Sequence, residues 1–320
     1  MDIWNQTTFV EFILAGLTND HVLQLLFFVV FLVIYMFSFL SNFGMILLIT
    51  TARHLHTPMY FFLGHLSFVD MCYSSTITPK MLSDFLAEIK FISLWACSIQ
   101  MSLFVMFATS ECLLVTGMAY DRYVAICRPL SYHNVMDRSM CWRLVTAAYC
   151  SSCLASIVHT VTIFSFPLCG SNKINHFYCD IPPLLKLVCP NTSFRKSLVF
   201  FLSLSMGIFS LLIILTSYAF IMSTILGIKS AEGRSKAIST CGSHLTVVSL
   251  FYFTVFCIYF RPSVGLDLET IDKFFSIFYT VASPLLNPII YSFKNSEVKR
   301  ALVNFFTIGK NMKFIVESLF

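Results

Sequence analysis

Two carboxylates are the first candidates for chemistry, because each lies deep within a long apolar segment of the chain. Asp70 and Glu111 are the only acidic residues in such positions. An ionised carboxylate at the centre of a bilayer costs roughly 3 kcal/mol or more, so both should face the interior of a helix bundle. There they could share a proton or bind a cation such as sodium. The alternative is a protonated structural pair that is hydrogen-bonded to Asn42, Ser283 or Asn287.

A second pair of charges lies at the end of another apolar run. Asp121 and Arg122 belong to the sequence MAYDRYVAIC, residues 118–127. At a membrane interface the two charges can reach water or each other. The pair by itself is explained either as a stop-transfer signal or as a functional ion pair.

Other reactive side chains do not form a recognisable catalytic or metal centre. His54 and His56 share a loop but have no third ligand nearby. Cys179 could bind a metal with His176, but it is better used in a disulfide. The segment GIKSAEGRS, 227–235, resembles a phosphate loop, yet it is one residue too long, has Arg in place of Lys and follows no predicted strand. We therefore expect no enzyme and no cofactor, a structural sodium ion excepted.

The composition indicates that lipid surrounds the elements that position these residues. Hydrophobic residues make up 57% of the 320 residues and charged residues only 12%, about half the share of an ordinary globular protein. The net charge of +5 is modest, and no basic run of the kind that binds nucleic acid is present. The chain lacks the charges that would cover a soluble protein of this size.

Seven stretches are long and apolar enough to cross a bilayer, which needs roughly 20 residues. The third contains Glu111, and Pro284 and Pro288 interrupt the seventh. The sequence therefore predicts an all-α membrane protein, a seven-transmembrane helix bundle. The predicted spans are 22–50, 58–83, 97–121, 140–163, 197–226, 237–260 and 271–293.

Positive charge predicts the orientation of the bundle. If the C-terminus is cytosolic, 13 of the 21 Lys and Arg residues lie inside. The glycosylation motifs at Asn5 and Asn191 then both lie outside, although Asn191 is close to the membrane. Beyond the last span, a short amphipathic eighth helix is predicted on the inner membrane face, because apolar residues recur at helical spacing. These residues are Val298, Ala301, Leu302, Phe305 and Phe306.

Four of the 12 cysteines fall on the predicted outer, oxidising side. They can form two disulfides in three ways, and their spacing does not choose among them. These four are Cys97, Cys169, Cys179 and Cys189.

One face of the third span is a candidate wall of a ligand pocket. Met101, Phe104, Val105, Ala108, Thr109 and Cys112 repeat at helical spacing. Helix–helix packing is the default interpretation of such a stripe. A pocket there would hold a neutral, mostly apolar ligand that hydroxyl groups orient. Candidate partners from other spans are Ser203, Tyr252, Tyr259 and Thr280.

Six motifs in order resemble those of the olfactory receptors, within the rhodopsin-like G-protein-coupled receptors. The motifs are LHTPMYFFL (55–63) with Asp70 downstream, MAYDRYVAIC (118–127), FYCD (177–180), SY (217–218), KAISTCGSHL (236–245) and PLLNPIIYSFKN (284–295). Ser41 and Ile238 depart from the usual pattern, where the family has glycine and an aromatic residue. The short N-terminus and loops are similar to the class II, tetrapod-type branch.

The resemblance implies a single receptor domain over 1–320, with an extracellular N-terminus at 1–21, a bundle at 22–293 and a cytoplasmic tail at 294–320. It implies the disulfides Cys97–Cys179 and Cys169–Cys189. It also implies a ligand cavity between the third, fifth, sixth and seventh spans, covered by the loop of Phe177 and Cys179, with Tyr252 as a switch beneath the ligand. The expected ligand-binding residues are Phe104, Val105, Ala108, Thr109, Ser203, Met206, Tyr252, Val255, Tyr259 and Thr280.

By the same resemblance, Asp121 holds Arg122 while the receptor rests, and Arg122 meets the G protein when the sixth span swings outward. Tyr218 and Tyr291 then turn in to support it. The residues expected in coupling and switching are Asp121, Arg122, Tyr123, Tyr218, His244, Asn287, Pro288 and Tyr291.

The resulting hypothesis is a plasma-membrane odorant receptor. It would bind small, mostly neutral volatile ligands and activate a stimulatory, olfactory-type G protein, which raises cyclic AMP. The partners are then the odorant, the G protein and membrane lipid, with no nucleic acid. One alternative is a chemosensory receptor for a metabolite or lipid outside the nose. Another is a cation-coupled transporter that uses Asp70 and Glu111, although no repeated pair of interrupted helices is present.

Overall fold

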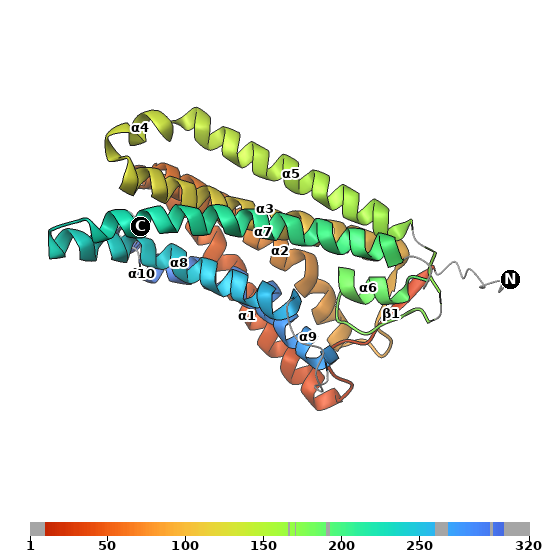
Figure 1. Ribbon diagram of the computed structural model, residues 1–320. Coiled ribbons are helices and arrows are strands. Elements are labelled where there is room, and N and C mark those ends of the chain that lie inside the picture. Colours follow the sequence, from red (N-terminus) through yellow and green to blue (C-terminus); the bar gives the residue numbers. More distant parts are fainter. Residues whose placement is uncertain are drawn as a thin grey trace, which may run out of the picture.

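Seven long helical segments lie side by side in the computed structural model (Figure 1), which describes residues 10–165, 167–169, 171–189, 193–259, 268–294 and 297–303. Each segment falls within a few residues of a predicted span, so the predicted fold is confirmed. The segments are α1 (His21–Thr51), α2 (Pro58–Phe85), α3 (Leu94–Cys127), α5 (Arg138–Phe164), α7 (Ser193–Leu226), α8 (Ala231–Tyr259) and a last one made of α9 (Leu268–Ile277), η4 (Phe278–Ala282) and α10 (Ser283–Lys294).

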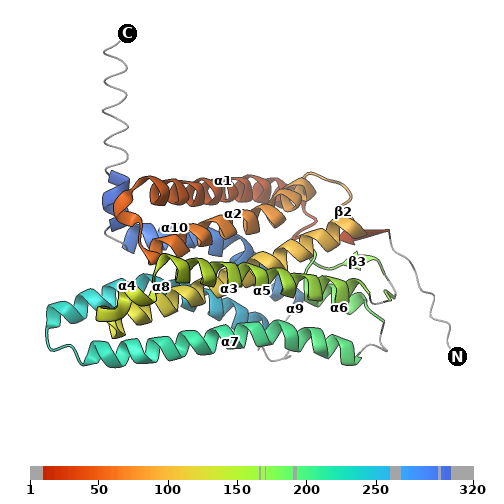
Figure 2. The same ribbon diagram turned by 90° about the horizontal axis from the view of Figure 1, so that it is seen from above.

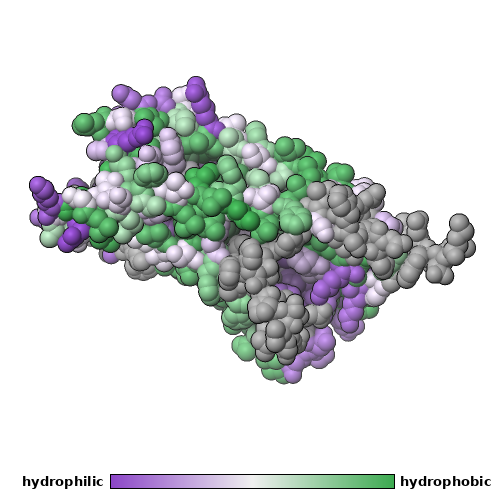
Figure 3. Space-filling model, in the orientation of Figure 1, coloured by the Kyte–Doolittle hydropathy of each residue, from purple (hydrophilic) through white to green (hydrophobic). Residues whose placement is uncertain are grey.

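Most of these helices are apolar enough to lie in lipid. Among the described residues, five stretches have the length and composition of a membrane span: His21–Thr51, Leu94–Cys127, Arg138–Phe164, Phe201–Leu226 and Asp272–Ser292. Helices α2 and α8 are as long but carry more polar residues, which the bundle partly encloses. Hydrophobic side chains cover the middle of the flank seen in Figure 3, and hydrophilic ones gather towards its ends.

Helix α3 lies at the centre of the bundle. It packs against α2, α5 and α7, whereas α1 packs chiefly against α2 and α10. Figure 2 shows α1 and α7 on opposite sides of the molecule with α3 between them. Large apolar residues such as Val22, Val33 and Leu40 are exposed on α1, as expected of a helix that faces lipid. Residues on α3 therefore reach more neighbouring helices than residues on any peripheral helix.

Two prolines shape the last segment. A proline lacks the N–H that would bond to the carbonyl four residues earlier. Pro288 thus frees the carbonyl of Pro284, and Asn42 of α1 donates to that carbonyl at 2.8 Å. Pro284 itself follows η4, a turn of π-helix, which inserts one extra residue and rotates the face that precedes it. The interruption that the prolines predicted is therefore present as an irregular turn, and the hydrogen bond from α1 stabilises it.

A small sheet and two disulfides close one end of the bundle, called here the disulfide end. Strand β1 (Glu11–Leu14) pairs antiparallel with β2 (Phe91–Ser93) and parallel with β3 (Lys173–Ile174). The disulfides are Cys97–Cys179 and Cys169–Cys189, the pairing that the resemblance implied. The sheet was not expected from the sequence, because its strands are too short to show a pattern.

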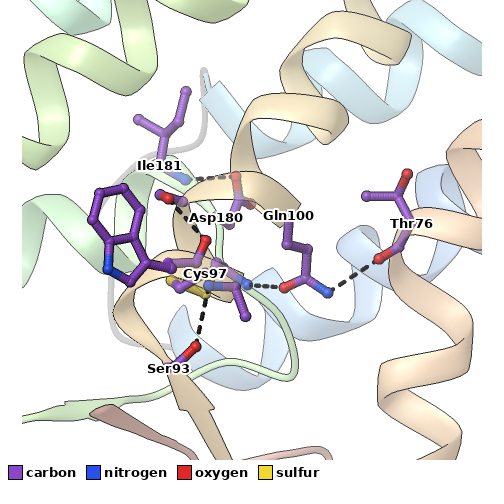
Figure 4. Close-up of a disulfide and its surroundings, with 10 residues drawn as sticks. Thr76, Ser93, Cys97, Gln100, Asp180 and Ile181 are labelled. Atoms are coloured by element: carbon purple, nitrogen blue, oxygen red, sulfur yellow. Dashed lines mark hydrogen bonds between the residues drawn. A yellow bond between two sulfur atoms is a disulfide. The ribbon is translucent and has the colours of Figure 1, made fainter. Parts of the chain in front are cut away.

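The disulfide Cys97–Cys179 fixes the loop between α5 and α7 onto the start of α3 (Figure 4). Gln100 strengthens this attachment. Its Oε1 accepts a hydrogen bond from the Cys179 backbone N–H at 3.0 Å, and its Nε2 donates to the Thr76 carbonyl of α2 at 3.2 Å. The short helix α6 (Ile181–Leu187) follows directly and lies over the bundle interior.

At the opposite end, called here the Arg122 end, α3 continues past Arg122 to Cys127. Asp121 and Arg122 therefore lie within the helix. The predicted span, 97–121, had placed them at its end. The chain then forms η2 (Pro129–Ser131) and α4 (Tyr132–Val135). Residues 297–303 are helical, and Val298 and Ala301 are buried against the bundle, which agrees with the predicted eighth helix. Phe305 and Phe306 lie outside the described residues.

The close approach of α2 and α3 makes a prediction about Gly117. A Cβ at this position would lie 3.3 Å from Cε1 of Phe62, a ring that is only 1% exposed. We expect Gly117→Val to lower the stability of the protein by about 1–3 kcal/mol, the usual cost of an overpacked core. Thermal unfolding of the purified protein in detergent measures this effect.

Gly44→Ala is the matched control, because a Cβ at Gly44 would meet no atom within 4 Å. This change should leave stability equal or raise it by up to about 1 kcal/mol, since alanine favours helix. Equal stability of Gly117→Val and the wild type would contradict the close packing of α2 on α3.

Candidate functional site

A cavity of about 150 Å³ lies between α3, α5, α7 and α8, beneath the start of α6. Its walls are mostly apolar, and Phe104, Phe251 and Tyr252 supply aromatic rings. Seven of the residues expected to bind ligand line it: Phe104, Val105, Ala108, Thr109, Ser203, Met206 and Tyr252. The helical stripe on α3 therefore faces an open space over its middle part.

Three expected ligand residues are not placed at this cavity. Thr280 is fully buried, and its hydroxyl donates to the Ser276 carbonyl at 2.6 Å. Its neighbour Tyr279 lines the cavity instead. The side chains of Val255 and Tyr259 lie outside the described part of the chain.

The cover of the cavity is formed by the residues that directly follow Cys179 in the loop. Asp180 and Ile181 line the cavity, whereas Phe177 and Cys179 do not. Asp180 is the N-cap of α6, and its Oδ1 accepts from the Ile181 N–H at 2.7 Å (Figure 4). Its Oδ2 accepts from the hydroxyl of Tyr178 at 3.0 Å and from that of Tyr279 at 3.3 Å.

Burial raises the pKa of Asp180 to about 6, although the three donors lower it. Because all three donors already point at the carboxylate, Asp180 joins the loop to η4 and offers little to a ligand. The sequence analysis included Asp180 only as the last residue of the FYCD motif and gave it no role at the cavity, because its contact with Tyr279 joins distant segments.

His159 is a second cavity residue that the sequence analysis missed. It lies on α5, only 5% exposed, on the face that also buries Ser152 and Ser156. Its Nδ1 lies 2.7 Å from the Ala155 carbonyl, and its Nε2 lies 2.9 Å from Oγ of Ser203 on α7. The spacing of Ser152, Ser156 and His159 is that of one helix face and was the available signal.

A chain of hydrogen bonds crosses the floor of the cavity and joins three helices. The Tyr252 hydroxyl of α8 lies 3.4 Å from Cys112 Sγ of α3 and 2.5 Å from Ser210 Oγ of α7. Ser210 Oγ is 2.5 Å from Thr116 Oγ1, which donates to the Cys112 carbonyl at 2.8 Å. One consistent direction, from Cys112 through Tyr252 and Ser210 to Thr116, uses each proton once.

One side chain, Asn287, bridges the two buried carboxylates. Nδ2 of Asn287 donates to Asp70 Oδ2 at 2.9 Å and to Glu111 Oε1 at 3.2 Å. The Ser283 hydroxyl donates to the same Glu111 oxygen at 3.0 Å. Asp70 Oδ1 and Asn42 Oδ1 are buried and have no hydrogen-bond partner within the described segments. The cluster therefore presents more acceptors than donors, which suits a proton or a cation with oxygen ligands.

The Arg122 end contains the second charged cluster. Asp121 is fully buried, and its Oδ2 lies 2.6 Å from Nη2 and 3.0 Å from Nε of Arg122. Its Oδ1 accepts from the Tyr132 hydroxyl at 2.8 Å. Tyr132 of α4 was missed by the sequence analysis, because only the fold brings it back to α3.

The remaining residues expected to act as switches differ in the contacts that they make. His244 Nε2 donates to the Val115 carbonyl at 3.1 Å, so its Nδ1 accepts from the Tyr218 hydroxyl at 2.6 Å. Tyr291 is buried, and its hydroxyl has no hydrogen-bond partner among the described residues. Tyr123 packs against Phe220 on the side of α7, away from these polar groups.

The comparisons with known proteins agree with this architecture. The sequence model of the family described as "Olfactory receptor" matches residues 31–308. The chain is 51% identical to mouse olfactory receptor 5G26 over 94% of its own length and 95% of that protein. It is 53% identical to mouse olfactory receptor 8U9 (93% and 95%) and 52% identical to the human receptor of that name (93% and 96%). The chain therefore belongs to the olfactory receptor family, whose members are seven-helix, multi-pass plasma-membrane receptors of the G-protein-coupled class and not enzymes.

Proposed function

We propose that the chain is an odorant receptor that binds a small, neutral ligand in the cavity between α3, α5, α7 and α8. Binding there activates a stimulatory, olfactory-type G protein at the Arg122 end and raises cyclic AMP. The observation that carries this proposal is the position of the cavity, whose floor is the chain of hydrogen bonds that joins α3, α7 and α8.

The size and lining of the cavity support a small neutral ligand. An apolar protein cavity of ~150 Å³ holds a molecule the size of benzene. Among the described residues, no lysine or arginine lines this cavity, and the one carboxylate of the described lining, Asp180, is already held by three donors. A charged ligand would lose its hydration there without gaining a counter-ion. Each additional methylene should change binding by about 1–3 kcal/mol, which gives graded selectivity.

The floor offers a route from ligand to G protein. A ligand shifts a conformational equilibrium only by binding one state better than the other. Tyr252 lines the cavity and belongs to the hydrogen-bond chain, so a ligand that displaces its ring favours movement of α8. Movement of α8 would also carry His244 away from Val115 and Tyr218. Arg122 could then leave Asp121 and meet the G protein, with Tyr218 and Tyr291 as its new neighbours.

Membrane orientation is part of the proposal. The disulfide end faces the cell exterior, where an oxidising environment maintains both disulfides. The Arg122 end faces the cytosol, as the excess of Lys and Arg on that side predicts. Glycosylation at Asn5, or at Asn191, stays a prediction, because both residues lie outside the described ranges. Lipid surrounds the exposed apolar faces.

The carboxylate cluster supports a structural sodium ion, with a shared proton as the alternative. Asp70, Glu111 and Asn42 supply oxygen atoms, two of which have no donor in the described chain. A bound cation would neutralise the two carboxylates and hold α1, α2, α3 and α10 together. A shared proton would neutralise one carboxylate only.

The first test concerns the coupling arginine. We expect Arg122→Ala to abolish the cyclic AMP response of transfected cells to an odorant panel, because the residue that meets the G protein is gone. Surface labelling should show the variant at wild-type abundance. Arg143→Ala is the matched control, since Arg143 is exposed on α5 and should leave the response unchanged. A full response from Arg122→Ala would reject the proposed coupling, and ligand uptake without any G-protein signal would favour a transporter.

The second test concerns the floor of the cavity. Tyr252→Phe keeps the ring but removes the hydroxyl that bonds to Ser210 and Cys112. We expect higher basal cyclic AMP and a loss of about 1 kcal/mol of stability, the usual value of one hydrogen bond. Tyr120→Phe provides the control, because no hydrogen bond of the Tyr120 hydroxyl is found among the described residues. Unchanged basal activity in Tyr252→Phe would contradict the proposed route.

The third test separates the cation from the proton. If sodium binds at Asp70 and Glu111, the melting temperature of the purified receptor is higher in sodium chloride than in choline chloride. Asp70→Asn should remove that difference, whereas Asp137→Asn should keep it, because asparagine caps a helix as well as aspartate does. Equal melting temperatures of the wild-type receptor in the two salts would leave the shared proton as the explanation.

A further inference from the structure

The hydrogen-bonding groups of the cavity indicate which functional group its ligand carries. Nδ1 of His159 lies 2.7 Å from the Ala155 carbonyl, which can only accept, so Nδ1 carries a proton. In the neutral imidazole Nε2 is then an acceptor. Ser203 Oγ lies 2.9 Å from it, and this contact is favourable only if the serine hydroxyl donates.

Ser203 therefore presents lone pairs to the cavity. Its only proton is used by His159 Nε2 or by the Val199 carbonyl, which lies 3.0 Å away. If the imidazole were doubly protonated, Nε2 would donate to Ser203, and the serine would donate to Val199. In either state the serine hydroxyl has no proton left for a ligand and at least one lone pair to receive one.

Among the described residues of the lining, Thr109 offers a further hydroxyl to a ligand. Tyr252 and Cys112 are engaged in the floor, and Asp180 is engaged with three donors. Thr109 lines the cavity, and no hydrogen bond of its hydroxyl is found within the described residues. This group can donate or accept. The cavity thus combines an obligate acceptor on α7 with a hydroxyl on α3.

We propose that the receptor selects small neutral alcohols and phenols, whose O–H group donates to Ser203 Oγ while the hydroxyl oxygen can accept from Thr109. This inference rests on the proposed odorant-binding function. Ethers, esters and ketones of the same size have no proton for Ser203, and they would leave its lone pairs buried without a donor. Aromatic rings on the lining, such as Phe104 and Phe251, favour phenols in particular.

The test compares isomers that differ only in the position of the oxygen. The full-length receptor in transfected cells is exposed to a panel of isomeric pairs, including 4-ethylphenol with 4-methylanisole and cyclohexylmethanol with methoxycyclohexane. Cyclic AMP is recorded as a function of concentration. We expect each hydroxyl compound to be about tenfold more potent than its ether, the usual effect of a buried hydrogen bond.

Variants of Ser203 test whether this residue is the source of the preference for hydroxyl compounds over their ethers. Ser203→Ala should reduce the potency ratio within each pair towards one, whereas Ser203→Thr, which keeps a hydroxyl, should preserve it. Ser205→Ala is the matched control, because Ser205 is exposed on the same helix and its hydroxyl donates to the Leu202 carbonyl at 2.9 Å. Surface labelling shows that each variant reaches the membrane.

The outcomes distinguish this inference from the function on which it rests. Ethers that equal or exceed their hydroxyl isomers would overturn the inference, and so would a preference that Ser203→Ala leaves intact. Activation only by odorants without an O–H group would overturn it as well, while the receptor function stands. No cyclic AMP response to any odorant, from receptor present at the surface, would overturn the proposed function itself.

Discussion

Hydrocarbon offers no hydrogen-bond partner, and this constraint explains where the polar groups of the bundle lie. A buried polar group within a span can be satisfied only by another group of the protein, because lipid supplies none. The carbonyl that Pro288 frees is therefore met by Asn42 of α1, and the buried Asp70 and Glu111 share the amide of Asn287. Such contacts do more than satisfy single groups. They fix the rotation of α1, α2, α3 and α10 relative to one another, because each bond has a direction that apolar packing lacks.

The polar contacts are arranged in layers, and α3 contributes to each of them. Gln100 holds the loop at the disulfide end, Cys112 and Thr116 belong to the floor of the cavity, and Asp121 holds Arg122. A displacement of α8 at the floor must therefore break directed bonds to α3 and α7 before packing can follow, which favours two discrete states over a continuous deformation. Tyr252 belongs to both the cavity and the floor, so in the proposed mechanism it is the residue through which a bound ligand favours one of these states.

The sequence predicted the helices and the helix faces, which depend on local periodicity. It did not predict the side-chain contacts between segments that are far apart along the chain. The seven helices and the inward face of α3 follow from the lengths and spacing of apolar residues, and the structure agrees within a few residues. Asp180 and Tyr132 gain their roles from contacts with Tyr279 and Asp121, which only the fold brings close to them. His159 shares a helix face with two buried serines, but that spacing did not indicate its contact with Ser203 on α7. Thr280 was expected at the cavity as a hydroxyl from the last span. The π-helical turn η4 rotates that face, and Tyr279 takes the place at the cavity instead.

The difference between hydrogen bonds, which have a direction, and apolar contacts, which have none, also affects how many ligands the cavity can accept. Apolar walls interact with any hydrocarbon shape that fits, and each methylene changes affinity only modestly. A hydrogen bond, in contrast, is lost entirely when the ligand lacks the right group, and the buried partner is left unsatisfied. A cavity with many apolar residues and one obligate acceptor should therefore tolerate variation in carbon skeleton more readily than variation in functional group. In the proposed recognition, the shape of the ligand sets graded potency within a class, while Ser203, which His159 holds in place, sets the boundary of the class.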